Sequence, residues 1–280
     1  MRVPGLKTAR RLGWRARASL GGVGVVLGYH RVTALRSDPH HLAVHPDHFR
    51  AQMEVLRANY RPVALDDLPE AVRESRSGAP PPVAVTFDDG YHDVVSEALP
   101  ILEALELPAT LFVLPGLWGQ VPAWEEGGPA SGPRLVEEAE VRALARHPLI
   151  TIGSHTLTHP AMDELPRPDR TRELRESRAQ LELVIMYNMT RFSHPFGRLW
   201  PGHEEEVRTA GYQLACTSRS GLVTAGCDPI SLPRLWPPDV GGPDFARWLG
   251  GWTGVRGSRG PVEGAGRSAG GDHTGGGAGR

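Results

Sequence analysis

Two pairs of reactive side chains follow two short apolar runs of this chain. Asp88 and Asp89 come directly after residues 83–87, and His155 and His159 follow residues 149–152. Each pair lies where a buried strand should end, which is where open α/β folds place their ligands and catalytic groups. One carboxylate and two imidazoles suit a single divalent metal ion, which leaves the second carboxylate for proton transfer. This division of roles predicts hydrolytic chemistry.

Each pair also has a simpler explanation when it is taken alone. Asp88 and Asp89 precede Gly90, so they could form a turn followed by a helix N-cap. An isolated His-x3-His is more often a pair of polar loop residues, although this spacing also turns both rings to one side of a helical turn. The two pairs together favour the metal site. Three protein ligands would leave an open position for a water molecule, whose pKa would fall toward about 7.

The surrounding elements predict an α/β domain built on parallel strands, because short β-branched runs alternate with helical patterns. The long segment 116–133, rich in Gly, Pro and Trp, is predicted to be a functional or mobile loop. Pro100 should kink its helix or start a turn. We expect strands at 23–29, 83–87, 109–114, 149–152, 191–193 and 213–217, and helices at 46–58, 66–74, 94–105, 135–145, 170–186 and 204–210.

Composition and net charge limit the kinds of molecule that this protein could bind. The chain has 280 residues, 40% of them hydrophobic, which is ordinary for a globular protein with a real core. A net charge of −1 gives no pull toward nucleic acid. No apolar run approaches the ~20 residues that span a bilayer. The basic start does not lead to a signal cleavage site, so we expect a cytoplasmic or membrane-peripheral location, with an extracytoplasmic one left open.

The chain divides into three predicted parts. Residues 1–19 form a basic lead-in that could touch anionic lipid or a polymer, although a solvated terminus is favoured. Residues 20–253 form the catalytic domain, and the Gly-rich residues 254–280 are predicted to be disordered. The oligomeric state stays open.

Three stretches resemble the polysaccharide deacetylase (NodB-type) family of carbohydrate esterases. They are Thr-Phe-Asp-Asp-Gly at 86–90, Ser-His-Thr-Leu-Thr-His at 154–159 and Phe-Ser-His-Pro-Phe-Gly at 192–197. The resemblance extends from about Leu27 to Trp236, and the first two motifs are specific when they occur together. It implies a distorted (β/α) barrel that removes acetyl groups from N-acetylated or O-acetylated sugars.

The resemblance also implies roles for individual residues. Asp88 would be the general base that activates water, and Asp89, His155 and His159 would hold one divalent metal ion. Zn²⁺ is the first choice, but two histidines and an aspartate also accept Co²⁺, Ni²⁺ or Mn²⁺. The backbone N–H of Phe196, which follows Pro195, would help the metal to stabilise the oxyanion.

The third motif departs from the common family pattern Arg-x-Pro-Tyr-Gly. Ser193 stands at the arginine position and Phe196 at the tyrosine position. The match is better to a branch of the family that works on exopolysaccharides, which has Phe-Ala-Tyr-Pro-Phe-Gly here and a later Leu-Pro-Arg, matched by residues 232–234. We hypothesise that Arg234, or with less support Arg191, supplies the cation that orients Asp88. The alternative is an ordinary surface arginine.

The general acid is also displaced from its common place. No Leu-x-His motif follows Gly197, but the exopolysaccharide branch carries a Tyr-His pair on its first strand, matched by Tyr29 and His30. A histidine at the end of a strand would lie at the same rim as the metal site, and imidazoles titrate near neutral pH. His30 is therefore the predicted acid, with a structural role as the alternative. For His194, substrate contact and simple packing stay open. The loop tryptophans could stack on sugar rings, although core or loop-anchoring roles are as well supported; they are Trp118, Trp124, Trp200 and Trp236.

The predicted function is metal-dependent removal of acetyl groups from N-acetylhexosamine units of a polymer or glycan. Its partner would be an acetylated amino-sugar polymer or oligosaccharide. One rival is a related C–N hydrolase acting on a small cyclic amide or ureide. The other is a catalytically silent sugar-binding module that keeps the motifs as architecture.

Overall fold

A closed parallel sheet organises the molecule. The computed structural model describes residues 22–124 and 132–255. Neighbouring strands of the sheet follow the order β1, β5, β6, β7, β8, β9 and β11, and every pair along this path is parallel. Leu235, just beyond β11, closes the sheet, because its backbone accepts from Gly28 N–H at 2.9 Å and donates to the Val26 carbonyl at 2.8 Å. The predicted distorted (β/α) barrel is therefore confirmed.

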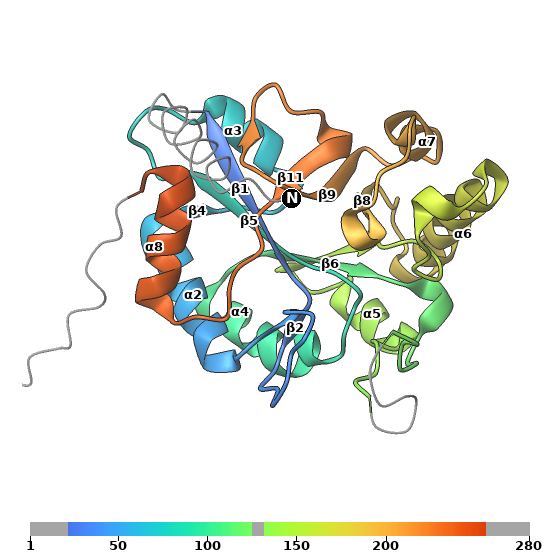
Figure 1. Ribbon diagram of the computed structural model, residues 1–280, viewed down its shortest axis with the longest axis horizontal. Coiled ribbons are helices and arrows are strands. Elements are labelled where there is room, and N and C mark those ends of the chain that lie inside the picture. Colours follow the sequence, from blue (N-terminus) through green and yellow to red (C-terminus); the bar gives the residue numbers. More distant parts are fainter. Residues whose placement is uncertain (1–21, 125–131, 256–280) are drawn as a thin grey trace, which may run out of the picture.

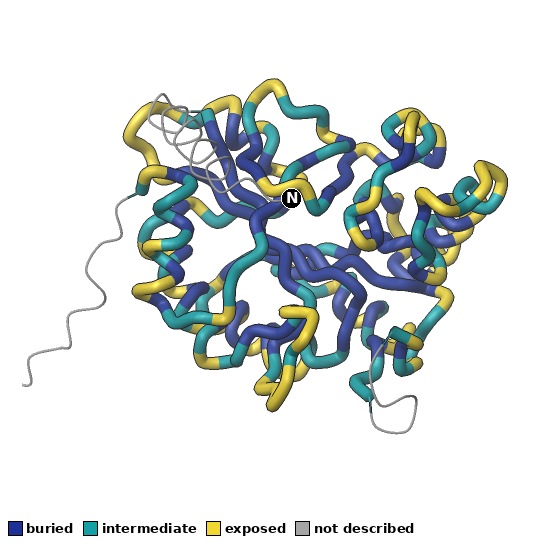
Figure 2. Tube along the Cα trace, in the orientation of Figure 1, coloured by how far each residue is buried: buried dark blue, intermediate teal, exposed yellow. Residues whose placement is uncertain are grey.

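The strands are short and mostly buried. In Figure 2 the sheet forms the dark, buried centre of the molecule. Both faces of β1 and β5 are covered, which explains their nearly continuous apolar sequences, with Thr86 in β5 as a buried polar exception. The strands are β1 (Val23–Tyr29), β2 (Arg31–Val32), β3 (Ala43–Val44), β4 (Arg61–Pro62), β5 (Pro82–Phe87), β6 (Ala109–Val113), β7 (Ile150–Ser154), β8 (Arg191–Ser193), β9 (Leu214–Ser220), β10 (Val223–Thr224) and β11 (Leu232–Arg234).

Helices surround the sheet (Figure 1). Phe49 of the first helix, for example, packs its ring against Tyr29 of β1 at 5.2 Å between centroids. None of the helices within residues 22–124 and 132–255 has the length and apolar character needed to cross a bilayer. The α-helices are α2 (Pro46–Asn59), α3 (Leu68–Glu74), α4 (Leu99–Leu105), α5 (Glu138–Leu144), α6 (Arg167–Ile185), α7 (His203–Thr209) and α8 (Gly242–Thr253).

Two helical predictions need correction, and one helix was missed. The helix expected at 94–105 is divided into a π-helix, η1 (Val94–Ala98), and α4, because Pro100 in the first turn of α4 has no N–H for a continuous ladder. The helix expected from 135 begins at Glu138, since Leu135 forms a β-bridge with Tyr91. Helix α8 was not predicted, because glycines interrupt its apolar pattern.

The parallel strands all point their carboxyl ends to one rim, and the candidate residues gather there. Asp88 follows β5, His155 follows β7, His30 follows β1, and Arg234 ends β11. The barrel thus brings together residues that are more than a hundred positions apart in the chain. The lead-in at 1–19 and the tail from residue 256 lie outside the described residues.

Candidate metal and catalytic centre

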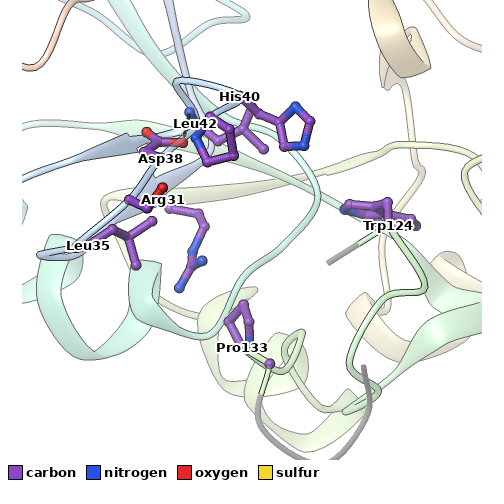
Figure 3. Close-up of a pocket in the computed structure, with 10 residues that line it drawn as sticks. Arg31, Leu35, Asp38, His40, Leu42, Trp124 and Pro133 are labelled. Atoms are coloured by element: carbon purple, nitrogen blue, oxygen red, sulfur yellow. Dashed lines mark hydrogen bonds between the residues drawn. The ribbon is translucent and has the colours of Figure 1, made fainter. Parts of the chain in front are cut away.

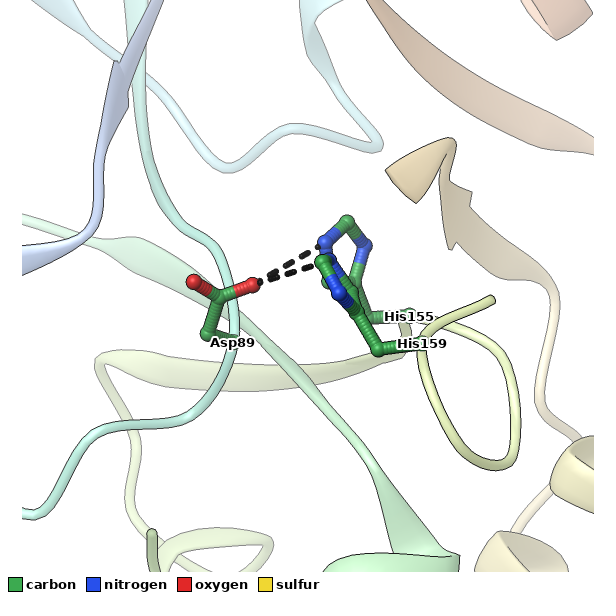
Figure 4. Close-up of side chains that lie close together, drawn as sticks. All are labelled: Asp89, His155 and His159. Carbon is green, nitrogen blue, oxygen red and sulfur yellow. Dashed lines mark ion pairs between the residues drawn. The ribbon is translucent and has the colours of Figure 1, made fainter. Parts of the chain in front are cut away.

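Asp89, His155 and His159 converge at the rim. Asp89 Oδ1 lies 3.2 Å from His155 Nε2 and 3.4 Å from His159 Nε2. All three side chains are buried, and one ligand atom from each lies within 4.8 Å of the others (Figure 4). A carboxylate oxygen facing two imidazole nitrogens is a donor set that suits zinc and similar divalent ions.

The tautomer of His155 supports the same interpretation. Its Nδ1 lies 2.9 Å from the Ser193 carbonyl oxygen. A carbonyl can only accept, so Nδ1 carries a proton, and Nε2, which faces Asp89, is the ring nitrogen that can bind a metal ion once it has lost its own proton. Metal-binding histidines are commonly oriented in this way by a carbonyl on the far nitrogen. The residues present therefore fit a divalent ion.

The backbone is bent sharply where it carries these ligands. Asp89 has a φ of 68°, His159 a φ of 62° and Thr156, between the two histidines, a φ of 75°. Such left-handed conformations are uncommon for residues other than glycine and often occur at functional sites. At Asp89 the bend separates its side chain from that of Asp88, so adjacent carboxylates acquire different partners.

Glu173 of α6 holds the segment that carries the histidines. One of its carboxylate oxygens accepts from the N–H groups of Leu157 and Thr158, at 2.8 and 2.9 Å, and the other accepts from Thr158 Oγ1 at 2.7 Å. Glu173 itself is buried. The sequence did not single it out, because it lies in a strongly charged helix and follows no motif.

Asp88 forms a buried bidentate ion pair with Arg234. The two guanidinium nitrogens donate to the two carboxylate oxygens at 2.8 and 2.7 Å, and Arg234 also donates to Ser193 Oγ at 3.0 Å. Arg234 is fully buried, so it is not a surface arginine. The less favoured candidate, Arg191, pairs instead with Asp66.

The charges of this cluster keep both aspartates ionised. Burial alone would raise the pKa of Asp88, but Arg234 and then His155 outweigh it and hold that pKa well below the usual range. Burial also raises the pKa of Asp89. The hydrogen bond with His155, followed by the electrostatic effect of His30, outweighs burial and lowers that pKa overall. Both carboxylates can therefore act as acceptors at neutral pH.

The two candidate ligand histidines differ in protonation. Burial lowers the pKa of His159 to about 4, so its ring is neutral. Burial acts in the same direction on His155, but the nearby Asp88 and Asp89 carboxylates raise its pKa overall. A metal ion must displace a proton to bind such a nitrogen, so its affinity should increase with pH.

His30 lies beside the carboxylates and against an aromatic ring. In its protonated form His30 would lower the pKa of both Asp88 and Asp89, so it lies within electrostatic range of the two carboxylates. Its ring stacks on Trp236, with 5.3 Å between centroids and 23° between planes. Trp236 in turn lies under the Arg234 guanidinium, 4.6 Å from ring centroid to Cζ. A Cβ at Gly28 would approach the Trp236 ring to 2.6 Å, so this packing requires glycine.

The turn at 195–197 presents Phe196 beside the metal-ligand group. Phe196 has a φ of 53°, is 58% exposed, and places its ring 4.5 Å from that of His159. Pro195, the preceding residue, is buried. Gly197 follows with a φ of 60°, where a Cβ would collide with Ser218. His194 is buried and its ring packs against that of Phe192, 4.9 Å between centroids, which favours the packing role.

Trp124 is a further residue of the site that the motifs did not identify. Its ring lies 4.5 Å from the His159 ring, and its Nε1 donates to the buried Tyr91 hydroxyl at 2.9 Å. The sequence indicated only that several tryptophans of loops could contact sugars.

Comparisons with known proteins agree with this geometry. The sequence model of the family described as "Polysaccharide deacetylase" matches residues 75–215, about half of the chain. Poly-beta-1,6-N-acetyl-D-glucosamine N-deacetylase of Escherichia coli K12 is 28% identical over 251 residues, which cover 75% of this chain. The chain spans only about a third of that relative, 36% of its length.

Two solved structures share the fold. IcaB from Ammonifex degensii is 26% identical with a TM-score of 0.68, covering 83% of this chain and 98% of that one. The deacetylase PplD of Streptococcus pyogenes, solved in complex with acetate, also has a TM-score of 0.68, at 22% identity, covering 82% of this chain and 98% of that one. With its motifs, its barrel and half of its length matched, this chain belongs to the polysaccharide deacetylase family.

Proposed function

We propose that this protein hydrolyses the amide bond of N-acetylhexosamine units in a polysaccharide and releases acetate. The observation that carries the proposal is the buried Asp89, His155 and His159 group beside the ion-paired Asp88. The name of the E. coli relative makes β-1,6-linked N-acetylglucosamine the first polymer to test.

Asp89, His155 and His159 would hold the metal ion, with Zn²⁺ as the first choice and Co²⁺, Ni²⁺ or Mn²⁺ as alternatives. When bound, such an ion supplies a Lewis acid that polarises the acetyl carbonyl and acidifies water. The His155 proton on Nδ1, fixed by Ser193, keeps Nε2 available as a ligand.

Asp88 would accept the proton of the attacking water. Arg234 occupies one lone-pair direction of each carboxylate oxygen, and each oxygen has a second lone pair for a further donor. The ion pair holds the carboxylate ionised and in one orientation, which a general base needs. Arg234 would thus be a positioning residue for Asp88.

His30 would donate a proton to the leaving amine, with its ring held by Trp236. The backbone N–H of Phe196, after Pro195, would donate to the developing oxyanion, and an N–H group fixed in advance at such a position typically contributes strongly to catalysis. The left-handed turn at Phe196 brings that residue next to His159.

The rival function, a sugar-binding module without catalysis, was supported by the absence of an arginine from the third motif. The buried Arg234 now stands against Asp88 and supplies a cation there. The site thus has a candidate group for each predicted role, which supports the hydrolase over the binding module.

The test is acetate release from β-1,6-linked and β-1,4-linked N-acetylglucosamine pentamers and from a cyclic ureide. We expect release from a pentamer, loss of release with a chelator, and recovery when Zn²⁺, Co²⁺, Ni²⁺ or Mn²⁺ is restored. Asp88→Asn should retain bound metal and lose at least about 10²-fold in rate, the usual contribution of a general base. Hydrolysis of the ureide alone, or no release with any metal, would overturn the proposal. Loss of metal in Asp88→Asn would reverse the roles of the two aspartates.

A further inference from the structure

The two candidate ligand histidines are held in different ways. The His155 ring is oriented by the hydrogen bond between its Nδ1 and the Ser193 carbonyl. The corresponding Nδ1 of His159 is buried, and no group within residues 22–124 and 132–255 forms a hydrogen bond with it. The backbone of His159 is fixed, because its N–H donates to Thr156 Oγ1 at 3.0 Å. The orientation of the His159 ring must therefore come from packing.

Two aromatic rings pack against the His159 ring. The centroids of the Trp124 and Phe196 rings each lie 4.5 Å from that of His159, and their planes are tilted from it by 38° and 57°. These distances are at the short end of the range for aromatic pairs, about 4.5–7 Å. Trp124 belongs to the segment between β6 and α5, and Phe196 belongs to the turn after β8. We call this pair of side chains the aromatic clamp.

The polar end of the Trp124 side chain is anchored away from His159. Its Nε1 donates to the hydroxyl of the buried Tyr91 at 2.9 Å, and the Arg31 guanidinium lies 5.0 Å from the centroid of the Tyr91 ring. The Trp124 side chain also lines a pocket of about 500 Å³ (Figure 3). Because this half-buried indole borders a pocket, a smaller side chain at its position should leave the barrel folded.

We propose that Trp124 and Phe196 are positioning residues for His159, and that they hold its ring in the orientation that binds the divalent ion. The inference rests on the metal site of the proposed function, but it does not depend on the substrate. A histidine ring without such contacts rotates about its side-chain bonds, and metal binding must then restrict that rotation. A ring that is fixed beforehand avoids this cost. The Phe196 side chain thus has a role separate from that of its backbone N–H.

Calorimetric titration of the metal-free full chain with Zn²⁺ tests the aromatic clamp. Trp124→Leu and Phe196→Leu keep an apolar side chain but remove the ring. We expect each to lower the Zn²⁺ affinity about three- to tenfold, in line with the usual contribution of an aromatic pair. Trp124→Phe and Phe196→Tyr keep a ring at the same position, so they should retain most of the affinity.

The matched control is Trp118→Leu, which makes the same substitution in the same segment. Trp118 is also half-buried, but it packs against the main apolar core. This variant should bind Zn²⁺ like the parent, although its unfolding free energy may fall as much as that of Trp124→Leu. Urea unfolding of each metal-free variant separates a loss of folding from a loss of metal affinity.

Unchanged Zn²⁺ affinity in folded Trp124→Leu and Phe196→Leu proteins would overturn the inference. An equal loss of affinity in Trp118→Leu, or in the variants that keep a ring, would overturn it as well. A parent protein that binds no Zn²⁺ would contradict both the inference and the proposed metal site. Loss of Zn²⁺ affinity confined to the two leucine variants, in a protein that releases no acetate, would contradict the proposed function alone.

Discussion

Two neighbouring aspartates take different partners in this site. Asp88 faces Arg234 and Asp89 faces the two histidines, although one peptide bond separates them. The left-handed backbone at Asp89 makes this divergence possible. A single strand end therefore supplies both a candidate base and a candidate metal ligand, each with its own charge environment.

Replacing Arg234 tests the positioning of Asp88. We expect Arg234→Gln to lower kcat for acetate release by about 10²-fold or more, because a general base contributes about that much when it is correctly held. Metal content should stay at the wild-type level, since Asp89, His155 and His159 are intact. Arg234→Lys keeps the charge but loses the bidentate geometry, so it should recover only part of the activity.

The control for this series is Arg191→Gln, which removes a partly exposed pair with Asp66 and should change kcat less than twofold. Removing one partner of a buried ion pair can cost about 3–5 kcal/mol of stability, so unfolding in urea is measured in parallel. Full activity in a folded Arg234→Gln protein would contradict the assignment.

Site residues that belong to a motif or follow a predicted strand could be identified from the sequence. Site residues that only tertiary packing brings to the centre could not. Asp89, His155 and His159 follow apolar runs, and the structure brings them together. Arg234 required a resemblance, because 146 positions separate it from Asp88. Glu173 gave no local signal, since a glutamate in a charged helix usually faces water. Trp124 was one of four loop tryptophans that could stack on sugars, and its sequence context does not distinguish it from the other three.

At the scale of elements, α6 supports the segment that follows β7. The backbone from Leu157 to Thr158 has little regular structure of its own, and the Glu173 carboxylate satisfies both of its N–H groups. This contact holds the two candidate ligand histidines at a fixed spacing. The metal site therefore depends on a helix that contributes no ligand to it.

Glu173→Ala should weaken metal binding without removing a ligand. Outer residues that orient metal ligands typically contribute about 10–100-fold in affinity, so we expect a loss in that range for Zn²⁺. The N–H groups of Leu157 and Thr158 would also lose their acceptor, but both residues are partly exposed and water can replace it, so the cost in unfolding free energy should stay below about 1–3 kcal/mol for each group. Calorimetric Zn²⁺ titration and urea unfolding measure the two effects.

Glu176→Ala is the matched control, because Glu176 is exposed on the same helix. It should change neither quantity appreciably. Equal Zn²⁺ affinities for the two variants would show that Glu173 does not position the histidines.

The six predicted strands agree with the structure within three residues at each end, because buried parallel strands have nearly continuous apolar sequences. Helix boundaries were harder to predict where tertiary contacts override the local sequence pattern. Leu135 has a helical context in sequence but pairs with Tyr91 as a bridge. Helix α8 is held by burial of Phe245 and Leu249, which a pattern interrupted by glycines does not reveal.

At the scale of the molecule, closure of the barrel makes the site possible. Leu235 joins the last strand to β1, and this brings Arg234 and Trp236 to the side of the barrel where His30 and Asp88 lie. The strand ends of β1, β5, β7 and β11 thus form one continuous rim. An ion bound there would tie the segment after β5 to that after β7.

The central claim is that Asp89, His155 and His159 bind one divalent ion. Its most direct test is anomalous diffraction at the zinc edge from crystals of the Zn²⁺-loaded protein. We predict a single peak at this site about 2.0–2.2 Å from one Asp89 oxygen and from Nε2 of each histidine, and its absence in crystals of Asp89→Ala. A loaded, active protein whose zinc peak lies at other side chains would contradict the account.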